Sequence, residues 1–325
     1  MIGGGVVGLT SALFLAREGF NVTLVESGRL FSGASGANLG ILSYSLGLVD
    51  GLDPSLLRRA LSTHKKLAEE LGHSIKVSEI VVPLTQAKAI IRELTRGIAA
   101  VFRAKYGFKR VEKLGLSLVV DDTLLIDPLE YRDSLVRRIG ELGVNVIENN
   151  GVEKLVGRGS RITEAILSNG SVIESDIYVL AAGPWSDEIL RPQGIELGVE
   201  SLKGYTILAR VDENIDRVIG VDPVFMRPHQ HRDDIVMIGG YKKPSGLDLE
   251  IDEKDIETML DTAVKVGVKP LEVLEVRVGL RPCLEEPVTR IIKYDNLIVS
   301  TGHCRHGMLL APQAADEIVR LARSM

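Results

Sequence analysis

The pattern of hydrophobic and polar positions changes from helical to strand spacing within the first 26 residues. Residues 6–18 carry apolar side chains on one helical face, and Gly19 is suited to end that helix. The next stretch, NVTLVE (21–26), alternates and is rich in β-branched residues, which is typical of a strand. A glycine-rich turn precedes the helix. The order turn, helix, strand predicts the front half of a Rossmann βαβ unit.

The remaining chain continues as a mixture of helices and strands. Residues 32–43 are rich in glycine and small polar residues, so we expect a loop or a tight turn there. Apolar spacing predicts helices at 54–72, 86–105, 128–142, 252–266 and 311–324. Strands are predicted at 75–84, 109–121, 144–157, 161–170, 171–183 and 295–303, with several more between 199 and 241. These elements predict a nucleotide-binding domain of separated segments with a second domain inserted between them.

Composition narrows the class of protein. A chain of 325 residues is long enough for one large domain or two intertwined ones. A net charge of −5 does not favour a nucleic-acid partner, and we see no signal peptide and no transmembrane segment. Cys283 and Cys304 are the only cysteines, so we expect reduced thiols without a disulfide in a soluble, cytoplasmic protein.

The glycines of the first turn carry the clearest chemical signal. Gly3, Gly5 and Gly8 form G-x-G-x-x-G, in which glycine permits the tight turn, close approach to a pyrophosphate and close helix–strand packing. Glu26 ends the following strand, where a carboxylate accepts hydrogen bonds from a ribose diol. The pattern predicts a dinucleotide, FAD or NAD; the alternative is a glycine-rich turn without a ligand. Because only Met1 and Ile2 precede the turn, we expect the native chain to begin upstream.

Four stretches together resemble the amine-oxidising flavoproteins of the D-amino-acid oxidase and glycine oxidase type. They occur in chain order at 26–42, 125–155, 178–187 and 278–312, and the last contains GLRP and TGHCRHGMLLAP. The resemblance implies an α/β fold with a Rossmann-like FAD-binding domain built from discontinuous segments, and an inserted α+β substrate domain of antiparallel sheet. We expect the FAD-binding domain to comprise 1–45, 122–190 and 276–325, and the substrate-binding domain to comprise 46–121 and 191–275.

The resemblance also implies a set of residues that hold FAD without a covalent bond. They include the glycine turn, the loop beside the flavin, an adenine contact and the turn that faces the flavin ring: Gly3, Gly5, Val6, Val7, Gly8, Glu26, Ser27, Ala34, Ser35, Asn38, Gly40, Ile41, Val152, Ala182, Gly183, Trp185, Gly302, His303, Arg305, His306, Gly307 and Met308.

In similar enzymes the arginine of the GLRP motif, here Arg281, binds the substrate carboxylate. Guanidinium is planar, forked and always charged, so it orients a carboxylate as well as binding it. The alternative is a structural salt bridge. Tyr205 and Tyr241 are further candidates for the catalytic site, with ordinary strand packing as the alternative. Related oxidases often carry a tyrosine where Phe225 stands here, which weakens the transfer of a tyrosine role.

The resemblance implies oxidation of a small amino acid, of the glycine or D-amino-acid type, by hydride transfer to flavin. The imine product then gives a keto acid and ammonia, and oxygen or a quinone-type carrier takes the electrons. Alternatives are a secondary-amine dehydrogenase acting on sarcosine or proline, an FAD-binding subunit of a larger complex, and an NAD-linked dehydrogenase. A homo-oligomer or a partner subunit fits each of these. We expect no metal, because HQHRDD (229–234) is typical of a polar hairpin turn and HCRH (303–306) has no second ligand pair.

Overall fold

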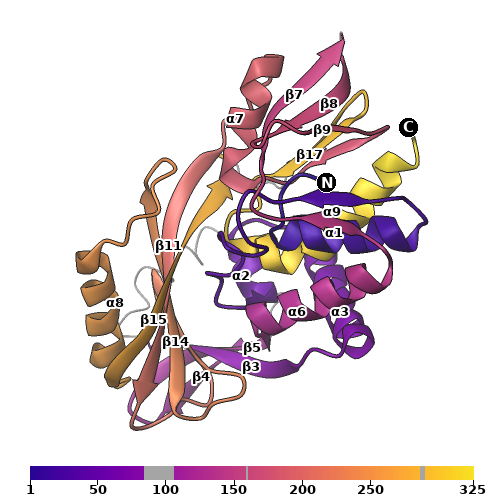
Figure 1. Cartoon of the computed structure of the whole chain (residues 1–325). Helices are drawn as coiled ribbons and strands as arrows, with labels where there is room; N and C mark the ends of the chain where they lie inside the picture. The colour runs from indigo at the N-terminus through magenta and orange to yellow at the C-terminus, as the bar shows by residue number, and fades with distance from the viewer. Residues whose placement is uncertain (84–105, 159, 286–289) are drawn as a thin grey trace.

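The computed structural model describes residues 1–83, 106–158, 160–285 and 290–325 (Figure 1). The helix expected at 86–105 lies outside these residues. In the described part of the chain, no helix is both long and apolar enough to cross a membrane.

A mainly parallel sheet forms around the first residues of the chain. Ile2 bridges in parallel to Val25 on one side and to Leu180 on the other, and its N–H donates to the Val179 carbonyl at 2.8 Å. Ile2 therefore lies between β1 and β10, and the sheet continues outward from them through parallel pairs. Its strands are β1 (Thr23–Val25), β6 (Asn145–Ile147), β10 (Tyr178–Leu180), β17 (Leu297–Thr301) and the antiparallel β16 (Arg290–Tyr294).

Four helices pack together beside this sheet, as Figure 1 shows. They are α1 (Val6–Arg17), α3 (Pro54–Leu71), α6 (Pro128–Glu141) and α9 (Gly307–Ala322). Their buried leucines and isoleucines form one hydrophobic cluster. Pro128 stands in the first turn of α6, as expected from the sequence, and Asp127 caps that helix through the N–H groups of Leu129 and Glu130.

A second, larger sheet has nine strands among the described residues. The sheet is mostly antiparallel. Helix α8 (Glu253–Lys265) packs against its strands β13, β14 and β15 (Figure 1). Tyr205, Ile207, Met226 and Met259 belong to the cluster that this packing buries. The strand order is β15 (Pro270–Cys283), β11 (Glu200–Val211), β14 (Ile235–Pro244), β13 (Val224–Pro228), β12 (Val218–Val221), β3 (Ile75–Pro83), β5 (Gly115–Ile126) and β2 (Ile41–Ser43), with β4 (Tyr106–Val111) also paired to β5.

A small antiparallel sheet and two short helices complete the arrangement. The sheet comprises β7 (Val152–Arg158), β8 (Arg161–Leu167) and β9 (Val172–Glu174), and the helices are α2 (Tyr44–Val49) and α7 (Ser186–Leu190).

Most predicted elements are present, with three corrections. The single strand expected at 109–121 is a hairpin of β4 and β5, because a turn around Lys113 divides the run. The three strand-like runs between 144 and 183 are the five strands β6 to β10. The long strand β15 was not predicted. It lies at the edge of the sheet and its first half is exposed on both faces, so its sequence lacks the alternation of apolar and polar residues that marks a half-buried strand.

Candidate active site

A cavity of about 620 Å³ runs from the glycine turn to the GLRP motif. Its walls come from the parallel sheet, from the loop 31–41, from strands β11, β13, β14 and β15 of the large sheet and from the turn before α9. A volume of this size lies in the usual range of ligand and cofactor sites.

The glycine turn at one end of the cavity has the close packing that a dinucleotide site requires. A Cβ on Gly8 would lie 1.9 Å from the Gly3 carbonyl oxygen, and a Cβ on Gly3 would lie 2.4 Å from the Ala181 carbonyl oxygen. The N-cap residue of α1 is Gly5, which has no side chain to accept hydrogen bonds from the first N–H groups of the helix. The start of α1 therefore presents backbone N–H groups and a partial positive charge to the cavity, which favours a phosphate.

Glu26 and Ser35 hold this turn in place from two neighbouring segments. The Glu26 carboxylate accepts hydrogen bonds from the Gly4 N–H at 2.6 Å and the Gly28 N–H at 2.9 Å. The Ser35 hydroxyl accepts from the Val6 N–H at 2.9 Å. A carboxylate has lone pairs for further donors, so Glu26 retains acceptor capacity for a ribose diol.

The cavity brings together most of the residues that the sequence predicted for the cofactor. The lining includes Gly3, Gly5, Val6, Val7, Glu26, Ser27, Ala34, Ser35, Asn38, Ile41, Val152, Ala182, Gly183, Trp185, His303, Arg305, Gly307 and Met308. Gly8, Gly40, Gly302 and His306 lie behind the wall. Gly40 has a φ of +67°, and a Cβ there would meet the Ile126 carbonyl oxygen at 2.0 Å, so glycine serves backbone packing at this position.

Arg281 lines the other end of the cavity and contacts the next two strands of the sheet, β11 and β14. A Cβ on Gly204 of β11 would lie 2.2–2.4 Å from the Arg281 guanidinium, so the absence of a side chain there makes room for the group. The Nη2 of Arg281 donates to the Gly240 carbonyl of β14 at 3.2 Å. Burial, together with the nearby charge of Arg305, lowers the pKa of Arg281 to about 10. The group stays charged at neutral pH.

The two tyrosines predicted for the catalytic site, Tyr205 and Tyr241, are not shown to offer a polar group to the cavity as Arg281 does. Tyr205 lines the cavity, but its hydroxyl lies 3.4 Å from an Asp255 oxygen and accepts from the Asp252 N–H at 3.3 Å, at the start of α8. These contacts favour the packing interpretation of Tyr205. Tyr241 lies in β14, and its side chain is outside the described part of the structure. Phe225 lines the cavity without a hydroxyl to offer.

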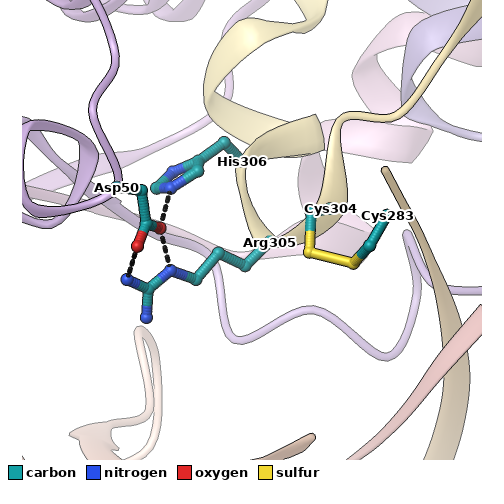
Figure 2. Close-up of a disulfide and its surroundings, with 5 residues drawn as sticks. All are labelled: Asp50, Cys283, Cys304, Arg305 and His306. Atoms are coloured by element: carbon teal, nitrogen blue, oxygen red, sulfur yellow. Dashed lines mark hydrogen bonds and ion pairs between the residues drawn. A yellow bond between two sulfur atoms is a disulfide. The ribbon is translucent and has the colours of Figure 1, made fainter. Parts of the chain in front are cut away.

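The expectation that both cysteines are reduced is wrong. Cys283 and Cys304 form a disulfide with an S–S distance of 2.04 Å and a Cα–Cα distance of 4.4 Å (Figure 2). Strand β15 carries Cys283 to the turn that follows β17, and nothing in the spacing of two cysteines reveals that contact. The disulfide joins the strand of Arg281 to the turn that carries Arg305.

That turn is also held by an ionic cluster. The Nε and Nη2 atoms of Arg305 both donate to the carboxylate of Asp50, which also contacts Nε2 of His306 (Figure 2). Burial acts to raise the pKa of Asp50, but the hydrogen bonds from His306 and Arg305 outweigh it and hold that pKa well below its usual range. Asp50 is therefore ionised at any working pH.

His303 is a buried, neutral side chain on the cavity wall. Burial lowers its pKa to about 4, and its Nε2 lies 3.0 Å from the Ser300 hydroxyl. No protein partner faces its Nδ1 within the described residues. The stretch HQHRDD (229–234), where a metal site was an alternative, lies in the hairpin between β13 and β14, and Nε2 of His231 lies 2.9 Å from a carboxylate oxygen of Glu130.

Residues 1–321 match the family described as FAD-dependent oxidoreductase (DAO). The chain belongs to this family. It is 30% identical to a glycine oxidase of Pseudomonas aeruginosa over 351 aligned positions, which cover 96% of this chain and 91% of that protein. Among solved structures, the glycine oxidase of Geobacillus kaustophilus matches with a TM-score of 0.85 at 18% identity, covering 99% of this chain and 93% of that one. An iminodiacetate oxidase of Chelativorans matches with a TM-score of 0.83 at 20% identity, covering 99% and 94%.

Membership of this family makes the protein an FAD-dependent oxidoreductase with a Rossmann-like FAD domain and a substrate domain. The residues present fit the cofactor. A Cβ on Gly3 or Gly8 would collide with neighbouring backbone atoms, and the start of α1, with glycine as its N-cap residue, suits a pyrophosphate. The cavity is lined by residues of both that turn and the turn before α9.

Sequence reasoning missed several residues that shape the site. Gly204 and Gly240 support Arg281, and Asp50 binds Arg305 from a segment 255 positions away. Arg227 is fully buried and donates to the carbonyls of Leu39 and Ile126, both at 2.8 Å, which fixes the loop on the cavity wall. Arg227 lies two residues after Phe225, and its sequence context does not distinguish it from a surface arginine.

Proposed function

We propose that the protein oxidises a small amino acid of the glycine or D-amino-acid type, releasing an imine that water converts to a keto acid and ammonia. The observation that carries this proposal is the position of Arg281. It lines the same cavity as the glycine turn, and two glycines leave room for its guanidinium or accept its hydrogen bond.

Arg281 is suited to bind and orient the substrate carboxylate. A forked cation on the cavity wall fixes both the position and the plane of a carboxylate, which in turn fixes the direction of the Cα–H bond. Positioning of this kind is the main contribution of the protein when a cofactor carries the chemistry. We assign no catalytic role to the hydroxyl of Tyr205, because it is engaged at the start of α8.

When bound, FAD supplies the two-electron acceptor for the C–H bond beside the amine. In this proposal the glycine turn and the start of α1 hold the pyrophosphate, and Glu26 binds the ribose. Residues 34–41, Val152 and Ala182–Trp185 lie along the rest of the cofactor, with the turn 302–308 at the flavin ring. The two-part division expected from the sequence is part of this proposal; its boundaries at 121/122 and 275/276 fall inside β5 and β15, which cross from one part to the other.

The names of the relatives support an amine donor. Glycine oxidase and iminodiacetate oxidase are named for a primary and a secondary amine, and both substrates carry a carboxylate beside the amine carbon. The second candidate function is therefore oxidation of a secondary amine. Arg281 serves it equally, because it binds the carboxylate and leaves the amine unspecified.

Anaerobic reduction of the bound flavin tests the proposal. Glycine, D-alanine, sarcosine and proline are added separately to the flavin-loaded protein, and bleaching near 450 nm is followed. We expect the fastest reduction with glycine or D-alanine. Reduction only by sarcosine or proline would establish the second candidate, and no reduction by any of them would contradict both. Admitting air afterwards separates an oxidase, which reoxidises fast, from a dehydrogenase.

Variants of Arg281 show whether the carboxylate is bound where we propose. Arg281→Ala should keep its flavin and raise the dissociation constant for the amino acid about 100-fold, as is usual for loss of one partner of a charged pair. Arg281→Lys keeps the charge without the fork and should fall in between. Loss of flavin in both variants, with unchanged substrate affinity of any loaded fraction, would show that Arg281 has another role.

A further inference from the structure

Two arginines converge on the same end of the cavity. Arg281 and Arg305 both belong to its wall, and the disulfide joins Cys283, two residues after Arg281, to Cys304, immediately before Arg305. The disulfide holds the two backbone segments together, with a Cα–Cα distance of 4.4 Å between the cysteines. Their proximity is also seen in the pKa of Arg281, which burial lowers first and the charge of Arg305 lowers further.

Both guanidinium groups already contact the protein. One contact of Arg281 is the hydrogen bond to the Gly240 carbonyl oxygen. Arg305 offers its Nε–Nη2 edge to the carboxylate of Asp50, which leaves Nη1 turned away from Asp50 (Figure 2). The Nε–Nη2 edge is one of the two edges through which a guanidinium binds a carboxylate by two hydrogen bonds, so Asp50 both occupies that edge of Arg305 and matches its charge.

Asp50 lies behind Arg305, outside the cavity wall. It follows α2, where it is the C-cap residue, and its side chain is about one fifth exposed. The charge of Arg305 is therefore matched from behind by a partly buried anion. On a partly buried cavity wall, a guanidinium without an anionic partner attracts a second anion more strongly than one whose charge is already matched.

We propose that Asp50 determines specificity: by occupying Arg305, it restricts the cavity to substrates with one carboxylate. Without the Asp50 charge, Arg305 binds a second carboxylate, and the site accepts dicarboxylic amino acids. This inference rests on the proposed function, because it takes Arg281 as the site of the first carboxylate.

The test compares two ligands of nearly equal shape. Succinate has two carboxylates, and succinamate has one carboxylate and one amide. Each is titrated into the flavin-loaded protein, and its dissociation constant is measured from the change in flavin absorbance. The ratio of the two dissociation constants measures how much the second carboxylate adds to the affinity. A general loosening of the structure weakens both ligands alike and leaves this ratio unchanged.

Asp50→Asn is expected to shift this ratio about tenfold or more in favour of succinate. The double variant Asp50→Asn/Arg305→Gln should return to the wild-type ratio, because the cation is gone.

Glu70→Gln breaks a surface ion pair with Arg17 and should leave the ratio unchanged. Arg305→Gln alone leaves Asp50 without its guanidinium partner and should shift the ratio about tenfold against succinate. If Asp50→Asn does not retain flavin, the shift of the ratio in Arg305→Gln tests the role of Asp50 by itself.

An unchanged ratio in Asp50→Asn and in Arg305→Gln, with succinamate still bound, would overturn the role of Asp50 alone. If neither ligand perturbs the wild-type flavin and Arg281→Ala leaves amino-acid affinity unchanged, the proposed function fails, and this inference fails with it.

Discussion

The two ends of the cavity are constructed in different ways. At the nucleotide end, glycines that are close in sequence shape the backbone, and Glu26 and Ser35 hold it from neighbouring segments. At the carboxylate end, Arg281 of β15 lies against Gly204 of β11 and donates to Gly240 of β14, and Arg305 of the turn before α9 donates two hydrogen bonds to Asp50, the C-cap residue of α2. One end depends on local backbone geometry, and the other depends on side chains that the fold brings together from distant segments. We expect substitutions at the two ends to affect different measurements.

The largest effect is expected at the nucleotide end, for Gly8→Ala. The added Cβ would lie 1.9 Å from the Gly3 carbonyl oxygen, so the turn must open. Affinity for FAD should fall on the order of 100-fold or more, seen as loss of yellow colour in the purified protein. Gly140→Ala in α6, where nothing lies within 4 Å of the new Cβ, is the matched control and should keep its flavin. A fully flavin-loaded Gly8→Ala protein would refute this account of the turn.

A matched pair of arginines separates stability from binding. Arg227→Met removes the donor to the carbonyls of Leu39, Ile126 and Pro228, and buried carbonyls without donors should lower the free energy of unfolding by about 3 kcal/mol. Arg281→Met makes the same chemical change on the cavity wall. It should cost much less stability and far more affinity for a carboxylate, which denaturant unfolding and ligand titration measure. Equal stability losses in both variants would contradict the distinction.

Acidification should destabilise the protein through its buried histidines, one of which lies on the cavity wall. Burial lowers the pKa values of His303 and His64 to about 4, below the value near 6.5 in the unfolded chain. The unfolded state therefore takes up more protons as the pH falls from 6.5 towards 4. Each histidine should cost up to about 2 kcal/mol of stability at pH 5, and the full contribution returns above pH 6.5.

His303→Gln isolates the histidine of the cavity. Urea midpoints measured between pH 7 and pH 5 should fall less steeply in this variant than in the wild type. The same slope in both proteins would show that His303 is accessible to protons in the folded state.

The smallest effect is expected for Gly204→Ala. The new methyl group would overlap the guanidinium of Arg281, which must move away from its place over β11. The KM for the amino acid should rise about tenfold while flavin content stays constant. Gly140→Ala again serves as the control. Lost flavin without a change in KM would place Gly204 with the nucleotide end instead.

The same contrast explains how much of the molecule the sequence predicts. The turn, α1, β1 and Glu26 follow one another within 26 residues, so their periodicity and spacing are readable directly. Arg281 was found through the motif around it. Asp50 and Arg305 are 255 positions apart, and the two cysteines carry no spacing that indicates a pair. Contacts of this kind depend on tertiary structure, and neither local propensity nor hydrophobic periodicity encodes them.

The most direct test of the two-ended cavity is a crystal structure of the flavin-loaded protein with a bound carboxylate such as acetate. The account predicts the pyrophosphate of FAD at Gly3–Gly8 and the start of α1, and the acetate paired with Arg281 beside Gly204. It also predicts that Arg305 remains bound to Asp50. A carboxylate bound elsewhere in the cavity, with Arg281 still engaged only by Gly240 and other protein atoms, would contradict the central claim.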